Sequence, residues 1–219
     1  DSNITTTAGG VNGLVTIDAG SGGVDLAYGK TISTTAAVDS GLASGAIDID
    51  ALGSVTLVGD LDTTGAARAI SVGSTGGAVT IDSANGSRIN IANIATKGGE
   101  STAANSSGGA AGTLTVTTSA GLITLNSSKI EAAGGAGSTQ GAGATITFSD
   151  AVELAGGAVT IDTGATGGNI VFQSRLNSED DGAGASAQRS LVLTAGAGNI
   201  TLTGAVGAAE SGGNNIGRL

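Results

Sequence analysis

The feature that most limits what this chain can fold into is a short repeated unit. Each unit begins with a glycine-rich corner, which is followed by an apolar residue, then commonly a threonine, and then a second apolar residue. The heptapeptide Gly-Gly-Ala-Val-Thr-Ile-Asp occurs twice without a difference, at Gly76–Asp82 and at Gly156–Asp162. Apolar residues two apart point to the same side of a strand, and the residue between them points to the other side. In the second copy, Val159 and Ile161 should therefore face inward and Thr160 should face water. A helix cannot use this spacing, and each interior glycine would cost a helix about 1 kcal/mol relative to alanine.

These units are too short to be stable strands alone. They span about three or four residues and recur roughly every 8 to 11 residues, with a Gly, Asn or Ser corner between them. A sandwich needs longer strands and larger side chains to fill a gap of about 10 Å between its sheets, and this chain of 219 residues has one Tyr, two Phe and no Trp. Coils stacked about 4.8 Å apart fill a narrow shared core with Val, Ile and Leu. We therefore predict an all-β parallel β-helix, or β-solenoid, with about three short strands per coil and on the order of seven coils.

A longer repeat is superimposed on the short unit. We expect one β-solenoid domain over residues 1–219, with internal modules at approximately 13–61, 77–130 and 157–206. The apolar positions follow in the same order in the last two modules, so that Leu114 matches Leu191. Between modules, Ile70 and Val72 are predicted to form another strand pair of the same kind.

Three stretches rich in Gly, Ser and Ala fall at the same point of each module. They are Ser33–Gly45, Ala95–Gly112 and Asn177–Arg189. We predict that they bulge as loops from one corner, because equivalent insertions on one side of a solenoid often form its binding face.

The residue types that are absent exclude several kinds of chemistry. The chain has no Cys and no His, which removes disulfides, thiolate chemistry, the usual zinc sites and imidazole catalysis. The formal net charge of -10 argues against a nucleic-acid partner, because there is no basic surface to replace phosphate counterions. No apolar run approaches the length of a membrane span, so no membrane insertion is expected. The chain begins at Asp1 without a signal-like run, and we expect a processed or excised piece.

Two runs of sequence resemble a known family. Gly167–Asn177 reads G-G-N-I-V-F-Q-S-R-L-N, and Leu191–Gly207 reads L-V-L-T-A-G-A-G-N-I-T-L-T-G-A-V-G. These runs resemble the repeats of large bacterial exoproteins of the filamentous-haemagglutinin-like kind, and the resemblance extends over nearly the whole chain. It implies a right-handed parallel β-helix, secretion to the bacterial cell surface, and a role as an adhesin shaft or matrix component.

The aspartate that follows the short strand, at Asp18, Asp82 and Asp162, is a candidate calcium ligand because calcium takes several oxygen ligands. The nonapeptide calcium-binding repeat is not present in register, and the equivalent positions elsewhere are Asn126 and Thr203. We therefore expect these aspartates to form turns, with calcium as the weaker alternative, and predict no metal or cofactor site.

The densest acidic cluster is Glu179, Asp180 and Asp181, with Arg175 and Arg189 nearby. Some β-helix enzymes cut acidic polysaccharides with carboxylates and basic residues, so a polysaccharide-acting enzyme is one alternative. The cluster lies in a predicted loop without aromatic platforms for a sugar. Catalysis needs a positioned acid and base, and we predict no catalytic residues and no enzyme activity.

Threonines two apart offer a sharper alternative. They occur at Thr113, Thr115 and Thr117, at Thr145 and Thr147, and at Thr201 and Thr203. This is the arrangement of flat threonine arrays on ice-binding solenoids, although threonine is also simply favoured in strands. Asn-Ile-Thr and Asn-Ser-Ser triplets match glycosylation acceptors, but asparagine at a solenoid corner explains them without a glycan.

A solenoid leaves unpaired strand edges at its two ends, which are usually covered by a polar cap or a helix. Neither Asp1–Gly10 nor Ser211–Leu219 has the pattern of an amphipathic cap. The expected partners are therefore further copies stacked end to end or flanking coils of a longer chain, together with a host-surface or matrix polysaccharide. We predict a non-enzymatic extracellular rod on a bacterial surface, used for adhesion or as a filament. The alternatives are a threonine-rich ligand-binding or ice-binding solenoid and the enzyme named above.

Overall fold

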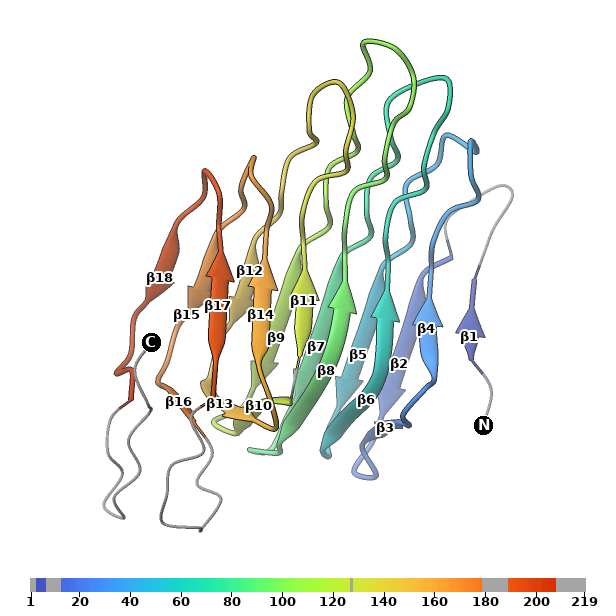
Figure 1. Ribbon diagram of the computed structural model, residues 1–219. Helices are drawn as coiled ribbons and strands as arrows, with labels where there is room; N and C mark the ends of the chain where they lie inside the picture. The colour runs from blue at the N-terminus through green and yellow to red at the C-terminus, as the bar shows by residue number, and fades with distance from the viewer. Residues whose placement is uncertain (1–2, 7–12, 127, 179–188, 208–219) are drawn as a thin grey trace.

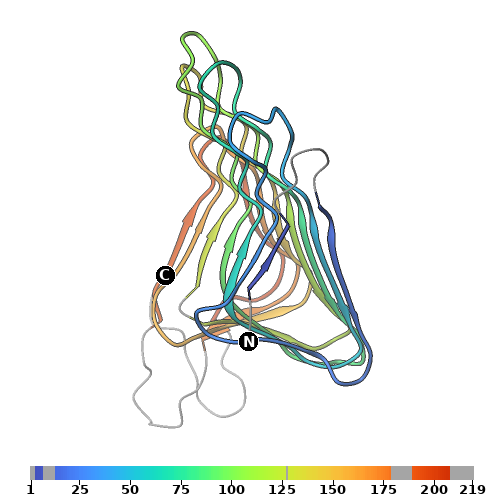
Figure 2. The ribbon, with the colours of Figure 1, turned by 90° about the vertical axis from the view of Figure 1, so that its right-hand side faces the viewer.

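The computed structural model describes residues 3–6, 13–126, 128–178 and 189–207, and over these residues it is a parallel β-solenoid of about 6 turns without a helix (Figure 1). This confirms the predicted all-β fold class and is close to the seven coils expected. In end view, the coils enclose a triangular body from which a thin extension projects at one corner (Figure 2). No helix in the described part of the chain is long and apolar enough to cross a membrane.

The three sides of the triangle are three parallel ladders, which we call face one, face two and face three. Face one consists of β2 (Val15–Ala19), β5 (Ile47–Ala51), β7 (Val79–Ser83), β9 (Leu114–Thr118), β12 (Ile146–Phe148), β15 (Ile170–Phe172) and β18 (Ile200–Leu202). Face two consists of β3 (Val24–Leu26), the first halves of β6 (Val55–Asp62) and β8 (Ile89–Ala95), β10 (Leu122–Asn126), β13 (Ala151–Ala155) and β16 (Leu176–Ser178).

Face three completes each coil. It consists of β1 (Ile4–Thr5), β4 (Thr31–Ser33), the second halves of β6 and β8, β11 (Lys129–Glu131), β14 (Val159–Asp162) and β17 (Leu191–Thr194). The register of β6 on β8 shifts between Leu57 and Asp60, where these two strands bend from face two to face three. Each described coil therefore has three strand segments, as predicted.

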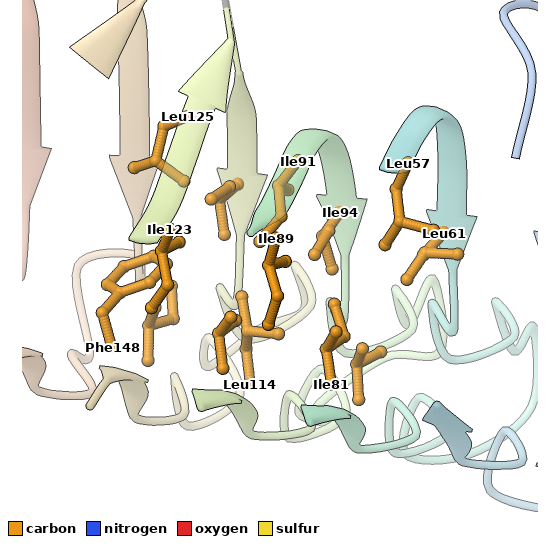
Figure 3. Packing of buried hydrophobic residues seen from close by; sticks show 14 of the residues in the cluster. Leu57, Leu61, Ile81, Ile89, Ile91, Ile94, Leu114, Ile123, Leu125 and Phe148 are labelled. Atoms are coloured by element: carbon orange, nitrogen blue, oxygen red, sulfur yellow. The ribbon is translucent and has the colours of Figure 1, made fainter. Parts of the chain in front are cut away.

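The alternation of the short unit turns the apolar residues of each strand inward, where they stack on the equivalent residues of the neighbouring coils. Val159 and Ile161 are fully buried and Thr160 between them is partly exposed, as the heptapeptide predicts. Leucines and isoleucines from all three faces meet along the axis, as Figure 3 shows for Leu114 of face one, Ile89 of face two and Leu61 of face three. In-register stacking fills the narrow core without large rings, because each side chain packs on the equivalent one in the next coil.

Two phenylalanines are the exceptions in this core. Phe148 in β12 lies opposite Phe172 in β15, and their rings stack with centroids 5.0 Å apart. Both side chains are fully buried. The pair shows that the coil cross-section admits a ring where two adjacent coils place one at the same position.

The turns between faces use residues that tolerate a positive φ. The turn from β7 to β8 has Asn85 at φ 60° and Gly86 at φ 67°, and the turn from β3 to β4 has Gly29 at φ 71°. Glycine and asparagine enter this region at little cost. The turn geometry therefore favours glycine and asparagine at these corners, although Ala120 takes φ 60° in the turn from β9 to β10.

The two identical heptapeptides do not occupy equivalent places. Gly76–Asp82 forms β7 on face one, whereas Gly156–Asp162 forms β14 on face three. The segment that begins near Gly13 forms β2 on face one, so the first two repeats agree face by face while the third is displaced by one face. Sequence similarity alone aligned all three repeats, because the strands of every face have the same alternation of apolar and polar residues.

The extension in Figure 2, which we call the wing, consists of the segments that connect face three to face one in four successive coils. They are residues 34–46, 63–78, 96–113 and 132–145. The corresponding connections of the next two coils, residues 163–169 and 195–199, are short. Each wing segment has an arm that leaves face three and an arm that returns to face one.

The backbone hydrogen bonds between the two arms recur at a spacing along the chain that differs from that of a β-strand. In one coil, Gly112 N donates to Thr96 O (2.7 Å) and Gly109 N to Gly99 O (2.8 Å), so the bonds are three positions apart on both arms. A period of three residues is that of an extended polyproline-II-type chain, whereas a strand alternates with a period of two. Gly99 N also donates to Ser74 O of the preceding coil (2.7 Å), so bonds run both within and between coils. The wing is a bundle of hydrogen-bonded extended arms.

Glycine is required where the arms pass one another. A Cβ on Gly98 would lie 1.9 Å from the carbonyl oxygen of Gly109, and a Cβ on Gly99 would lie 2.0 Å from that of Ala66. Only glycine permits backbones to approach this closely from two sides, as at the crowded axis of collagen. This close packing accounts for much of the glycine in the second and third of the four wing segments.

A stack of buried threonines joins the wing to the triangular body. The Oγ1 atoms of Thr34, Thr63 and Thr96 each donate to a carbonyl oxygen of the returning arm at 2.6 Å, and Thr163 does so at 2.7 Å. Ala132 occupies the equivalent position in the coil between. These hydroxyls satisfy backbone carbonyls that would otherwise be buried without a partner.

The predicted loops have different outcomes. Ser33–Gly45 and Ala95–Gly112 lie at the wing corner, as expected, but Asn177–Arg189 connects β16 on face two to β17 on face three, and most of it lies outside the described residues. The prediction of a shared corner was wrong for this third stretch because its module is displaced by one face. The predicted strand pair Ile70 and Val72 is also wrong: both lie in the wing segment after β6, 80% and 51% exposed.

Candidate functional site

The outer surface of face one has a flat array of threonines. Thr80, Thr115 and Thr147 lie opposite one another in β7, β9 and β12. Thr113 and Thr145 precede the same strands, and the Thr117 hydroxyl lies 3.4 Å from Ser149 Oγ. The structure thus places five of the threonines singled out in the sequence on one surface, whereas Thr201 and Thr203 lie in and after β18, with Val171 between Thr147 and Thr201.

The same face is acidic in its first three coils. Asp18, Asp50 and Asp82 lie opposite one another in β2, β5 and β7. Thr117 of β9 continues this row in the next coil. The three aspartates lie within strands and point outward, so the turn role predicted for Asp18 and Asp82 is wrong. Like charges in register repel, so we expect this ladder to lower the stability of the folded state.

Asp162 does have the turn role. Its Oδ1 accepts a hydrogen bond from Gly164 N at 2.7 Å, which closes a short turn where face three ends. In the part of the chain that the structure describes, no group of three or more acidic side chains is arranged to hold a metal ion. Calcium binding, the weaker alternative, has no geometric support in the described coils.

The acidic cluster Glu179–Asp181 lies outside the described residues. Of the two arginines near it in the sequence, Arg189 donates from Nη1 to the carbonyl oxygen of Gly156, and Arg175 accepts a hydrogen bond at its carbonyl from Val152 N at 2.9 Å. Arg189 thus lies where face two turns into face three, whereas Arg175 lies between β15 and β16, where face one turns into face two. The hypothesis of an enzyme site at this cluster stays untested.

A groove of about 880 Å³ follows the outgoing arms at the angle between face three and the wing. Its charged and amide side chains are Lys97, Glu100, Glu131, Gln140 and Asp162. Glu131 forms an ion pair with Lys129 at 3.1 Å, and Asp162 is held in its turn, so these two carboxylates are already committed to structural contacts. The remaining walls are mostly Gly, Ala and Thr. This groove therefore offers few side chains that could bind a ligand in a defined orientation.

A smaller hollow of about 410 Å³ lies at the corner between face two and face three. Its lining residues include Tyr28, Val58, Asp60, Asn90, Asn93 and Asn126. Tyr28 is 86% exposed although it is the only tyrosine of the chain. The sequence analysis missed this site; the available signal was a lone aromatic residue next to a glycine in a corner.

The first and last coils that the structure describes have strands paired on one side, and part of the interior is exposed in the last one. In the described part of the chain β2 and β3 are paired only with β5 and β6, and β17 and β18 only with β14 and β15. Ile170 is fully buried, but Ile200, its partner one coil further, is 44% exposed. The last described coil therefore presents both unpaired backbone groups and apolar side chains.

Comparisons with known protein families, with curated proteins and with solved structures find no significant match to this chain. The structure supports the β-solenoid part of the resemblance to filamentous-haemagglutinin-like exoproteins. Membership of that family stays a prediction.

Proposed function

We propose that this protein is a non-enzymatic structural rod of a bacterial surface, which extends by stacking coil on coil at its ends. The observation that carries the proposal is the exposed interior of the last described coil, where Ile200 and Leu202 continue the stacks of Ile170 and Phe172 but lie 44% and 39% exposed. An unpaired, apolar strand edge is a template for another strand. Of the two expected partners, a second copy and the flanking coils of a longer chain, we propose the second copy.

The extracellular location and the adhesive role follow from the resemblance to the exoproteins. The net charge of -10 keeps the lateral faces of such rods apart, because like-charged surfaces repel. Association is then favoured only at the ends, where apolar area and backbone hydrogen bonds outweigh the repulsion. The right-handed sense of winding belongs to this proposal and would be tested by an experimental structure.

The test is a matched pair of lysine substitutions. Ile200→Lys places a charge on the exposed end, and Leu52→Lys places one on a lateral turn, where Leu52 is 51% exposed. We expect wild type and Leu52→Lys to form concentration-dependent linear assemblies in electron microscopy and light scattering, and Ile200→Lys to remain a single short particle. A wild type that stays monomeric at every concentration, or an Ile200→Lys variant that assembles like wild type, would contradict the proposal.

A second candidate function rests on the threonine array of face one. In-register threonines on a flat surface match the ice-binding alternative, and Thr80, Thr115 and Thr147 provide one such row. In the earlier coils Asp48 takes the place of threonine in the row of Thr80, and Asp82 does so in the row of Thr117, so this function ranks below the rod. Thermal hysteresis that disappears in Thr115→Lys would support it, and no hysteresis in the wild type would reject it.

A further inference from the structure

Two polar side chains of the corner hollow are held by hydrogen bonds to neighbouring coils. Asn93 Nδ2 donates to Asp60 Oδ1 at 2.9 Å, and Asn93 Oδ1 accepts from Lys129 N at 3.0 Å. Asp60 is held in turn by its backbone, since its N donates to Lys30 O at 2.9 Å. Two planar polar side chains from adjacent coils thus lie side by side at the hollow, joined by a hydrogen bond.

The backbone of the turn that carries the aromatic residue at the rim is held in place. Tyr28 lies in the turn from Ala27 to Lys30, which is closed by Lys30 N donating to Ala27 O at 3.1 Å. The next coil lies tightly against this turn, because a Cβ on Gly59 would come within 2.3 Å of Lys30 O. The backbone that carries the ring is supported from behind, although the ring itself lies almost entirely in water.

Several polar atoms of the hollow are uncommitted. Asp60 Oδ2 and the side-chain amide of Asn90 make no hydrogen bond with any residue that the structure describes. Val58, 37% exposed, adds an apolar contact beside them. The hollow therefore combines one exposed ring, an apolar patch and planar hydrogen-bonding groups that can both donate and accept.

We propose that this hollow binds a neutral saccharide, with Tyr28 as the platform on which a sugar ring packs. A sugar ring has an apolar face of C–H groups and a rim of hydroxyls, which match an exposed aromatic ring and nearby carboxylate and amide groups. The volume of about 410 Å³ lies in the range of small-molecule sites. The binding goes beyond the proposed rod and would stand if the ends did not associate.

The charge of the site selects a neutral ligand. Asp60 is the charged side chain of the hollow, and the chain as a whole has a net charge of -10. An acidic sugar would bring a second carboxylate toward Asp60, and like charges repel. Neutral hexose or N-acetylhexosamine units avoid this repulsion.

The chain offers a direct reporter for this binding. It has one tyrosine and no tryptophan, so tyrosine fluorescence reports on Tyr28 alone. The probes are neutral oligomers of glucose, mannose, galactose and N-acetylglucosamine, with oligogalacturonate as the acidic comparison. We expect a saturable change of emission with at least one neutral oligomer at millimolar concentration or below, and none with oligogalacturonate.

Variants measured by calorimetry separate stacking from hydrogen bonding. We expect Tyr28→Ala to bind about tenfold more weakly and Tyr28→Phe to retain most of the affinity, since the ring face is kept. Asn90→Ala should bind several-fold more weakly, and Thr147→Ala on face one should bind as wild type does. The proposal would be overturned if no neutral oligomer changes the emission, if Tyr28→Ala binds as tightly as wild type, or if the acidic oligomer binds best.

Discussion

Replacing Gly135 by alanine tests whether the wing is a close-packed bundle that depends on bare glycine backbones. A Cβ at this position would lie 1.9 Å from the carbonyl oxygen of Gly99. Carbon and carbonyl oxygen in close contact are normally about 3.3 Å apart or more, so the two arms would have to separate by about 1.4 Å. The displaced residue takes part in two hydrogen bonds, Gly135 N to Gly109 O and Gly141 N to Gly135 O, both at 2.9 Å.

The expected cost follows from these contacts. Losing two backbone hydrogen bonds costs about 1 kcal/mol each, and forcing extra atoms into a packed site costs about 1 to 3 kcal/mol. We expect Gly135→Ala to lower the free energy of unfolding by about 3 to 5 kcal/mol, as the sum of these terms. Urea unfolding followed by circular dichroism measures this loss, and hydrogen exchange at the Gly135 and Gly141 amides shows whether the wing opens by itself.

Gly20→Ala is the matched control. Nothing lies within 4 Å of a Cβ built at Gly20, so this substitution should change stability by less than about 1 kcal/mol and can even stabilise the fold by restricting the unfolded chain. A Gly135→Ala variant that loses less than about 1 kcal/mol, with wild-type exchange rates in the wing, would refute the close-packing argument.

Three further substitutions test other parts of the fold by the same urea unfolding. Thr96→Val removes a hydroxyl that donates to Gly112 O at 2.6 Å and should cost about 1 to 3 kcal/mol, whereas Thr115→Val on the outer surface should cost little. Asp50→Asn relieves repulsion from the aspartates on either side and should raise stability by about 0.2 to 1 kcal/mol per neighbour at low salt, a gain that shrinks in about 1 M NaCl. Phe148→Ala deletes a fully buried ring stacked on Phe172 and should cost about 3 to 5 kcal/mol; a loss below about 1 kcal/mol would mean that the core tolerates the cavity.

The strands and the solenoid could be predicted from the sequence, because an alternation such as that of Val159, Thr160 and Ile161 indicates a strand with one side buried. The sequence was not sufficient for the face on which a strand lies. The two copies of the heptapeptide form β7 on face one and β14 on face three, since the three faces make the same demand on their residues.

The wing was beyond sequence reasoning for a different reason. Its segments appeared to be loops because they lack the alternation of two, and the bonds that order them have a period of three set by neighbouring coils. The corner hollow was missed because Tyr28, Asp60 and Asn93 come from three different coils. Sequence separation hides such a site until the coil length is known.

The displacement of the third repeat by one face has a consequence for how a rod of this kind can lengthen. Because an identical heptapeptide is accommodated in β7 and in β14, the smallest interchangeable part is a single strand with its corner, which is only a fraction of one circuit. A duplication that adds a fraction of a coil can then preserve the fold, provided that the following corners bring the later strands back onto the three faces.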